Sequence, residues 1–282
     1  MSFAVDRVEV ISNSGVRAVR HECVVPGAGL PEAVTVRAEE MRPYFRLKYA
    51  AGRVMAALLL VPALPLIGVL VLLVRATSRG PGIYRQVRVG AGGRSYVMYK
   101  IRTMRHDAEA SSGPVWAAPN DARMTRLGHF LRKVHLDEFP QLFNVVKGEM
   151  ALIGPRPERP EFTEILTQQL PGYLDRLQVK PGITGLAQIN LPPDTDLDSV
   201  RRKLVLDLEY IRQAGVTLDL RILACTSLRL VGCSGQLASR LTRLDRYMIY
   251  VGRLFRDQEA AARLRAKTAQ QSAERASQAT RI

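Results

Sequence analysis

The sequence predicts an α+β, mainly helical protein in which a re-entrant membrane helix-break-helix precedes a small domain with a β-hairpin and amphipathic surface helices. Three observations carry this prediction: an uncharged apolar stretch over residues 54–74, a β-hairpin pattern that follows it, and amphipathic helical patterns in the second half of the chain. Hydrophobic residues make up 47% of the 282 positions, which excludes a wholly disordered chain.

The apolar stretch has 21 residues, enough to cross a bilayer once as a helix. Pro62 and Pro65 lie near its middle, where each removes a backbone donor and kinks a helix. Both flanks are basic, and a spanning helix would leave one basic flank on the outside, where Lys and Arg are disfavoured. We therefore expect a helix-break-helix that enters and leaves on the cytoplasmic face. A plain crossing and a buried core helix are the alternatives.

The net charge of +15 is unevenly distributed, with a sum of −2 over residues 1–41 and +6 over residues 234–282. Such an excess indicates an anionic partner, which is a nucleic acid, a membrane surface or a phosphorylated substrate. Basic residues are not interleaved with aromatic ones, and there is no nucleic-acid-binding motif, so the sequence predicts no nucleic-acid partner. Three cysteines, mostly far apart, favour a reducing compartment over a disulfide framework.

Local patterns predict the elements after the apolar stretch. Two strands are expected over 83–89 and 94–101, joined by a glycine-rich turn. Helical spacing recurs over 161–170 and 200–214. From Gln236 onward, apolar residues fall on one face of a helix with arginines around it. Packing on the domain, a membrane-surface contact and a homo-oligomer contact remain open for this face.

The densest run of unusual residues is 132–158, within which a helix is predicted over 141–146, stopped by Lys147 and Gly148. Asp137 and Glu138 stand just before Pro140, a pattern typical of a helix start, with Asp137 as the N-cap. A cap and nothing more is the simplest interpretation of Asp137. A helix N-terminus also presents free N–H groups and favours a bound phosphate.

Several cations surround this acidic pair in the sequence. Arg132 precedes it, Arg156 lies in a rigid Gly-Pro-Arg-Pro turn, and Lys100 and Arg102 end the second predicted strand. Fixed cations offset the charge of a diphosphate, while carboxylates hold Mg²⁺ or attack phosphorus. The sequence therefore predicts phosphoryl transfer chemistry, with different roles for the two adjacent acids.

These motifs occur in one order that resembles the bacterial sugar transferase family, the monotopic phosphoglycosyl transferases that start glycan assembly on a polyprenyl phosphate. The exopolysaccharide branch of that family is similar over residues 158–162. The matching segments, besides the proline-containing apolar stretch, are 84–90, 99–104, 136–144, 147–150, 154–157 and 179–190.

The resemblance implies a transfer of sugar 1-phosphate from a UDP-sugar to undecaprenyl phosphate, with release of UMP, at the cytoplasmic face of the inner membrane. By matching position, Asp137 is the nucleophile that carries an aspartyl-phosphosugar intermediate, and Glu138 is the second acid, a Mg²⁺ ligand or a proton acceptor. Asp137 is also an implied Mg²⁺ ligand. Lys100, Arg132 and Arg156 match phosphate-binding cations. Nucleotide-sugar binding is implied for Arg102, Lys180 and Gln188.

The resemblance also divides the chain into four segments. Residues 42–80 form the membrane-embedded part and 81–233 the cytoplasmic catalytic domain, while 1–41 and the basic tail 234–282 fall outside the family pattern. His135 departs from the usual Ser or Thr two positions before the nucleophile. The competing hypothesis is a non-catalytic membrane scaffold of a glycan assembly complex. The sequence does not identify the sugar.

Overall fold

The computed structural model describes residues 43–109, 121–245, 248 and 252. These residues form two compact units, one ending at Ile183 and the other beginning at Thr184. The predicted catalytic segment 81–233 therefore extends over both units, and the apolar stretch belongs to the first. The predicted N-terminal extension, residues 1–41, and the end of the tail, residues 253–282, lie outside the described residues.

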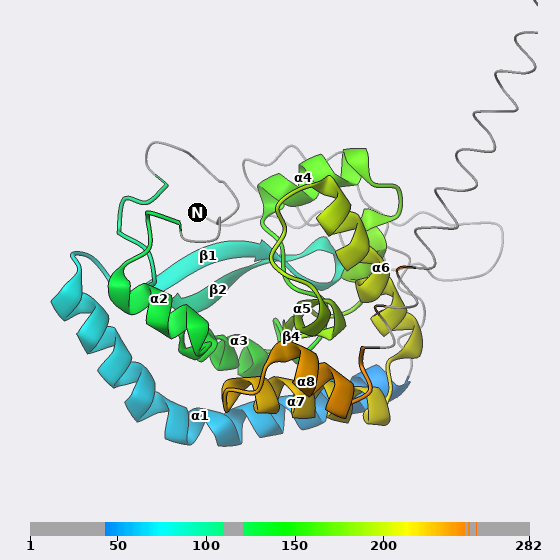
Figure 1. The fold of residues 1–282 in the computed structure, drawn as a ribbon, viewed down its shortest axis with the longest axis horizontal. Helices are drawn as coiled ribbons and strands as arrows, with labels where there is room; N and C mark the ends of the chain where they lie inside the picture. Colours follow the sequence, from blue (N-terminus) through cyan, green and yellow to red (C-terminus); the bar gives the residue numbers. More distant parts are fainter. Residues whose placement is uncertain (1–42, 110–120, 246–247, 249–251, 253–282) are drawn as a thin grey trace, which may run out of the picture. The chain divides into compact units, whose positions relative to one another are not determined.

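Unit 1 begins with α1 (Pro43–Thr77), a helix of 35 residues that contains both Pro62 and Pro65. Figure 1 shows that α1 bends near its middle. A proline removes one backbone hydrogen bond and its ring displaces the preceding carbonyl, which kinks a helix without ending it. The expected break into two helices is therefore wrong: α1 is bent and continuous. The re-entrant path stays a prediction.

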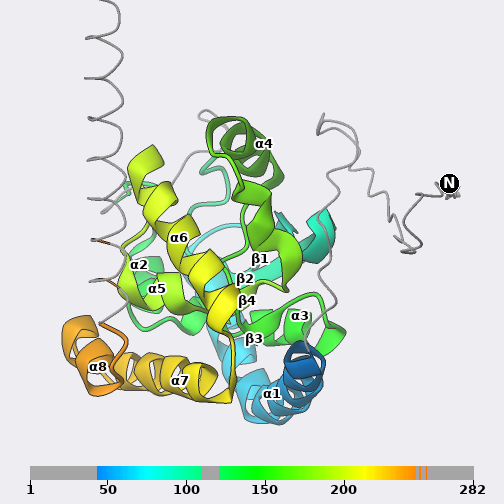
Figure 2. The same cartoon turned by 90° about the vertical axis from the view of Figure 1, so that its right-hand side faces the viewer.

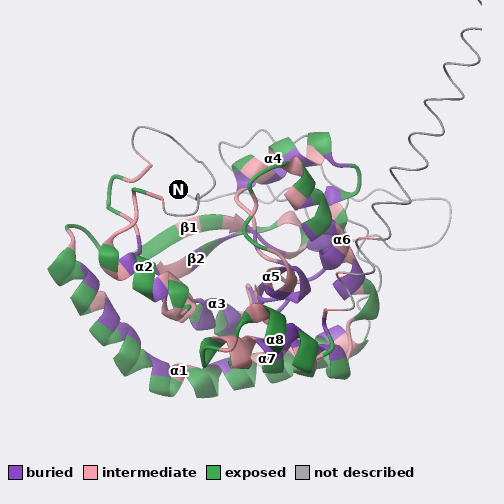
Figure 3. Cartoon of the chain, in the orientation of Figure 1, coloured by how far each residue is buried: buried purple, intermediate pink, exposed green. Residues whose placement is uncertain are grey.

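One stripe of α1 is buried and the rest is exposed and apolar. Ala56, Ala63 and Ile67 lie in the buried stripe, whereas the side of the helix that carries Val61 and Leu72 faces outward, with exposures of 69% and 68% for these two residues. Figure 3 shows α1 as mainly exposed. Among the described residues, α1 alone has the length and apolar composition to cross a membrane.

The predicted hairpin is confirmed. β1 (Ile83–Val89) pairs antiparallel with β2 (Ser95–Ile101), with Ile83 opposite Ile101 and Val89 opposite Ser95. The glycine-rich connection forms the short 3₁₀ turn η1 (Ala91–Gly93). This register places Lys100 next to the end of β2, opposite Tyr84.

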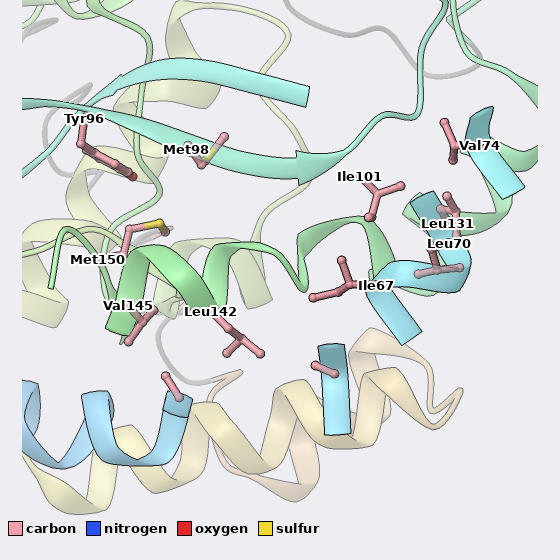
Figure 4. Close-up of a cluster of buried hydrophobic side chains, with 12 residues drawn as sticks. Ile67, Leu70, Val74, Tyr96, Met98, Ile101, Leu131, Leu142, Val145 and Met150 are labelled. Carbon is pink, nitrogen blue, oxygen red and sulfur yellow. The ribbon is translucent and has the colours of Figure 1, made fainter. Parts of the chain in front are cut away.

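The core of unit 1 lies between the hairpin and α1. Helix α3 (Gln141–Lys147) occupies this space, as Figures 1 and 2 show from two directions. Leu142 and Val145 point from α3 toward α1, while Met98 of β2 and Met150 pack from the other side (Figure 4). The buried stripe of α1 is thus one wall of the domain core.

The remaining elements of unit 1 complete the chain around this core. Helix α2 (Arg126–Lys133) precedes the acidic pair, and α4 (Pro160–Gln169) confirms the helix expected over 161–170. The 3₁₀ segment η3 (Tyr173–Gln178) follows α4. The short strands β3 (Ala151–Ile153) and β4 (Gly182–Thr184) form a second two-stranded sheet, and unit 1 ends within β4.

Unit 2 is helical over its described residues. Helix α5 (Leu186–Asn190) contacts α6 (Leu197–Gln213), α7 (Val216–Leu230) and α8 (Gly235–Leu241). Helix α6 confirms the helix expected over 200–214 and begins with a capping box.

The continuous amphipathic helix expected from Gln236 is wrong over residues 242–245, because α8 ends at Leu241. Arg243 adopts a left-handed backbone conformation with φ of 56°, and the backbone N–H of Leu244 donates to the carbonyl of Ser239. This turn buries Leu244 completely. Burying a leucine contributes about 2 kcal/mol, which offsets the ~1–2 kcal/mol cost of one left-handed residue.

Candidate active site

The acidic pair lies on a tight turn in front of α3. Leu136–Glu138 form the 3₁₀ turn η2, preceded by His135 in the left-handed conformation with φ of 56°. The backbone stays helical through Pro140, so that the N–H groups of Leu142 and Phe143 bond to Phe139 and Pro140. The first turn of α3 therefore needs no side-chain cap, and the prediction of Asp137 as N-cap is wrong. Its carboxylate is available for another purpose.

Glu138 holds two of the predicted cations. Its Oε1 atom accepts from Lys100 Nζ at 2.9 Å and from Arg156 Nη1 at 3.4 Å. The Lys100 and Glu138 side chains are each 15% exposed, whereas that of Arg156 is 40% exposed. Three segments far apart in the sequence thus meet at one carboxylate oxygen.

Asp137 has different surroundings from its neighbour. The residue is 5% exposed, and no described residue makes a hydrogen bond or an ion pair with its carboxylate. Lys100, Arg132 and Arg156 are nonetheless close enough to act on it electrostatically. A desolvated carboxylate surrounded by cations, with no protein partner, is suited to react with an anionic electrophile that the cations hold.

The pKa values of the two adjacent acids consequently shift in opposite directions. Burial raises the pKa of Asp137, and the positive charges of Lys100 and Arg132 offset only part of that effect. Burial also acts on Glu138, but Lys100 and Arg156 outweigh it and lower the pKa of Glu138 to about 2. Burial lowers the pKa of Lys100, with partial compensation by Glu138. Glu138 is therefore the weaker base of the pair.

Arg132 reaches the site from the last turn of α2. Its Nε donates to the hydroxyl of Thr103 at 3.0 Å. The helix packs close to this residue, because a Cβ on Gly128 would lie 1.9 Å from the carbonyl oxygen of Thr103. Only glycine permits that approach. Thr103 lies within a predicted motif but was not among the predicted site residues, since its role depends on this packing.

Asn144 is a second residue that the sequence did not identify as part of the site. It is fully buried, and its side chain accepts from the N–H of Tyr99 and donates to the carbonyl of Val97 and to Glu149. These bonds attach α3 to β2 beside Lys100, and so fix Lys100 relative to Glu138. Its position inside the matching segment 136–144 is the sequence feature that could have identified it.

Three residues that were predicted to bind the nucleotide-sugar make contacts with parts of the protein other than the acidic pair. Arg102 is buried and donates to the carbonyls of Ser78 and Arg79 at the end of α1. The Lys180 Nζ lies 4.7 Å from the ring centre of Tyr49 on α1, and Gln188 belongs to α5 in unit 2. Their roles in binding stay predictions.

The acidic pair offers a limited set of metal ligands. Within the described ranges, no group of three or more His, Cys, Asp or Glu side chains could hold a metal ion. Mg²⁺, however, is commonly held by one or two carboxylates together with substrate phosphates and water. Asp137 and Glu138 fit that mode, with most ligands supplied by the substrate.

Comparison with known proteins gives a consistent result. A family model described as bacterial sugar transferase matches residues 44–232. A Caulobacter vibrioides protein named UDP-glucose:undecaprenyl-phosphate glucose-1-phosphate transferase is 38% identical over 204 residues, covering 71% of this chain and 72% of that protein.

Two further relatives are longer than this chain. A protein of the same name from Xanthomonas campestris pv. campestris is 38% identical over 187 residues, 66% of this chain and 39% of its own. An Aeromonas hydrophila UDP-N-acetylgalactosamine-undecaprenyl-phosphate N-acetylgalactosaminephosphotransferase is 39% identical over 170 residues, 60% of this chain and 40% of its own. The chain thus spans about two fifths of the length of these two relatives.

Proposed function

Because the chain belongs to the bacterial sugar transferase family, we propose that it transfers a sugar 1-phosphate from a UDP-sugar to undecaprenyl phosphate and releases UMP. This reaction initiates the assembly of an exopolysaccharide or another glycan on its lipid carrier. The three relatives described above carry names of this reaction class, with glucose or N-acetylgalactosamine as the sugar.

One observation carries the mechanistic part of the proposal: Asp137 is a buried carboxylate without a hydrogen-bond or ion-pair partner among the described residues, beside a neighbour that holds two cations. A carboxylate that served only structure would be expected to have its hydrogen bonds satisfied. Its raised pKa makes Asp137 the better nucleophile of the two acids.

The reaction proceeds in two displacements at one phosphorus atom. An Asp137 oxygen attacks the sugar-bearing phosphorus of the UDP-sugar, the bond from that phosphorus to the bridging oxygen breaks, and UMP leaves with the electron pair. A phosphate oxygen of undecaprenyl phosphate then attacks the same phosphorus. The bond to Asp137 breaks, which restores the carboxylate and yields the lipid diphosphate sugar.

The neighbouring residues act by electrostatics. Lys100, Arg132 and Arg156 offset the charge of the diphosphate and of the developing transition state. Glu138 holds Lys100 and Arg156 in place through its hydrogen bonds. Its low pKa makes it a poor proton acceptor. Mg²⁺ bound to the diphosphate and to one or both acids would supply further charge neutralisation.

The exposed apolar side of α1 supports membrane attachment. Exposed apolar patches of this extent mark membrane or protein contact sites, and α1 has the composition of a membrane helix. We assign the catalytic domain, residues 81–233, to the cytoplasmic side of the inner membrane, where a UDP-sugar and a lipid phosphate would meet. A re-entrant path of the bent helix would place both basic flanks on the cytoplasmic side, where Lys and Arg are favoured.

The test is a panel of UDP-sugars with undecaprenyl phosphate and Mg²⁺, scored by UMP release from the detergent-purified protein. We expect release with at least one sugar, and its loss in Asp137→Asn. Asp198→Asn is the matched control, because the Asp198 side chain is exposed on α6. Activity of Asp137→Asn close to that of the control would remove Asp137 from the nucleophile role.

A further inference from the structure

The loop that carries Arg156 is held by four donors from three parts of unit 1, which are β1, η3 and β4. Its consecutive carbonyl oxygens, those of residues 155–158, are called here the carbonyl row. In order along the chain, they accept hydrogen bonds from Gly182 N at 2.9 Å, Arg176 Nη2 at 2.7 Å, Arg88 Nη1 at 3.1 Å and Val89 N at 2.9 Å.

Two of these donors, Arg88 and Arg176, are arginine side chains that are not among the predicted site residues. Arg176 belongs to η3 and is only 3% exposed. Its guanidinium also donates to the hydroxyl of Tyr173 at 2.9 Å. Arg88 of β1 additionally contacts Glu158 at 3.3 Å, with 15% of its side chain exposed. Because Arg176 is almost fully buried, its guanidinium has little surface with which to contact a substrate.

The sequence of the loop makes external donors necessary. Pro155 and Pro157 have no backbone N–H, so the loop has few donors with which to organise itself. Gly154 lets it approach the chain near β4, because a Cβ there would lie 2.4 Å from the carbonyl oxygen of Lys180. The loop is therefore fixed from outside, on both sides of Arg156.

Arg156 needs such support. Its side chain is 40% exposed and, among the described residues, its guanidinium bonds only to Glu138, at 3.4 Å. A long, partly exposed side chain held by one weak contact keeps much of its rotamer freedom. Fixing the backbone beneath it limits the positions that the guanidinium can reach.

We propose that Arg88 and Arg176 are positioning residues, which hold the carbonyl row so that Arg156 faces the substrate diphosphate. They do not contact the substrate themselves. This inference rests on the proposed function, because it assigns Arg156 to the diphosphate. Misplacement of a substrate-orienting group by about 1 Å costs up to roughly 100-fold in rate, so we expect a loss of about 10- to 100-fold in kcat/KM for the UDP-sugar in Arg176→Met.

The experiment is a double-mutant cycle between Arg176→Met and Arg156→Ala, with UMP release and thermal unfolding measured for each variant. If Arg176 acts through Arg156, the double variant has the same kcat/KM as Arg156→Ala alone, because no side chain remains to be positioned. Arg176→Lys should recover part of the activity, since one donor can still reach the row. If Arg156→Ala has no measurable rate, Arg156→Gln replaces it in the cycle, because glutamine carries no charge to be positioned against the diphosphate.

Arg102→Met provides the matched control, as another buried arginine that bonds to backbone carbonyls, in this case at the end of α1. Its effect should add to that of Arg156→Ala. Should Arg176→Met fail to fold, Arg88→Met enters the same cycle with the same expectation.

The outcomes separate this inference from the proposed function. No UMP release from the unmodified protein with any UDP-sugar would contradict the function itself. In an active enzyme, additive losses for Arg176→Met and Arg156→Ala would overturn the positioning role, as would full activity of Arg176→Met or of Arg156→Ala.

Discussion

Amide substitutions of the two adjacent acids should change stability in opposite directions. Glu138 is held by Lys100 and Arg156, so Glu138→Gln removes a favourable charge interaction and leaves Lys100 buried without its partner. Asp137 carries a buried charge that no described residue pairs with, so Asp137→Asn removes an unfavourable one. At neutral pH we expect Glu138→Gln to lower the midpoint of thermal unfolding and Asp137→Asn to raise it.

The size of the Glu138 effect follows from its pKa. A decrease from 4.5 to about 2 is a difference of about 2.5 pH units, or about 3 kcal/mol of stability. For a protein of this size, each 1 kcal/mol shifts the midpoint by about 2–4 °C. Glu138→Gln should therefore lower the midpoint by roughly 6–12 °C.

The pH dependence gives the sign of each effect separately. The folded-state pKa of Glu138 lies below its unfolded value, so its stabilising contribution is present above pH 4.5 and is lost as the pH falls toward 2. The folded-state pKa of Asp137 lies above its unfolded value of 3.8, so its contribution is present below pH 3.8 and is lost as the pH rises through the folded-state pKa. The deficit of Glu138→Gln should shrink in acid, and the gain of Asp137→Asn should grow toward neutral pH.

The assay is thermal unfolding of the detergent-purified variants between about pH 3 and pH 8, monitored by intrinsic fluorescence. Shifts of both variants in the same direction at neutral pH would refute the reasoning. A Glu138→Gln deficit that does not change with pH would also contradict it.

Three further substitutions test individual contacts. Asn144→Ala removes three buried side-chain hydrogen bonds and should lower the free energy of unfolding by about 3 kcal/mol in denaturant titrations. Gly154→Ala places a Cβ 2.4 Å from the Lys180 carbonyl and should lower kcat/KM for the UDP-sugar by about tenfold or more, whereas an unchanged value would show that the loop tolerates displacement. Arg243→Gly relieves a left-handed backbone and should raise stability by about 1 kcal/mol with unchanged UMP release, while the helical control Arg240→Gly should lower it.

The parts of the fold that local patterns determine were predictable. The hairpin over 83–101 was predictable because alternating apolar residues and a glycine-rich turn are compatible with few other structures, and the structure confirms it. The helical patterns over 161–170 and 200–214 likewise matched α4 and α6. Each of these predictions needed only residues that are neighbours in the chain.

Predictions that depended on tertiary packing were less accurate. Asp137 was expected to cap a helix, but the preceding turn already continues the helical backbone. The tail helix was expected to continue past Leu241, but burial of Leu244 favours a turn. The proline-containing stretch was expected to break, yet α1 bends while its buried stripe remains packed on α3.

The candidate site shows the same division. The motifs placed Lys100 and Arg156 near the acidic pair, and the structure brings both onto Glu138. Motifs alone could not show that Arg102 bonds to the end of α1, nor that Arg176 holds the backbone of Arg156. Those contacts join segments whose proximity only the folded chain establishes.

The most direct measurement of the central claim is a rapid-quench experiment with a UDP-sugar labelled in the sugar, in the absence of undecaprenyl phosphate. If Asp137 is the nucleophile, label becomes covalently attached to the protein together with a burst of UMP, maps to the peptide that contains Asp137, and is absent from Asp137→Asn. Adding undecaprenyl phosphate should then move the label from the protein to the lipid. UMP release that requires undecaprenyl phosphate and leaves no label on the protein would contradict the account.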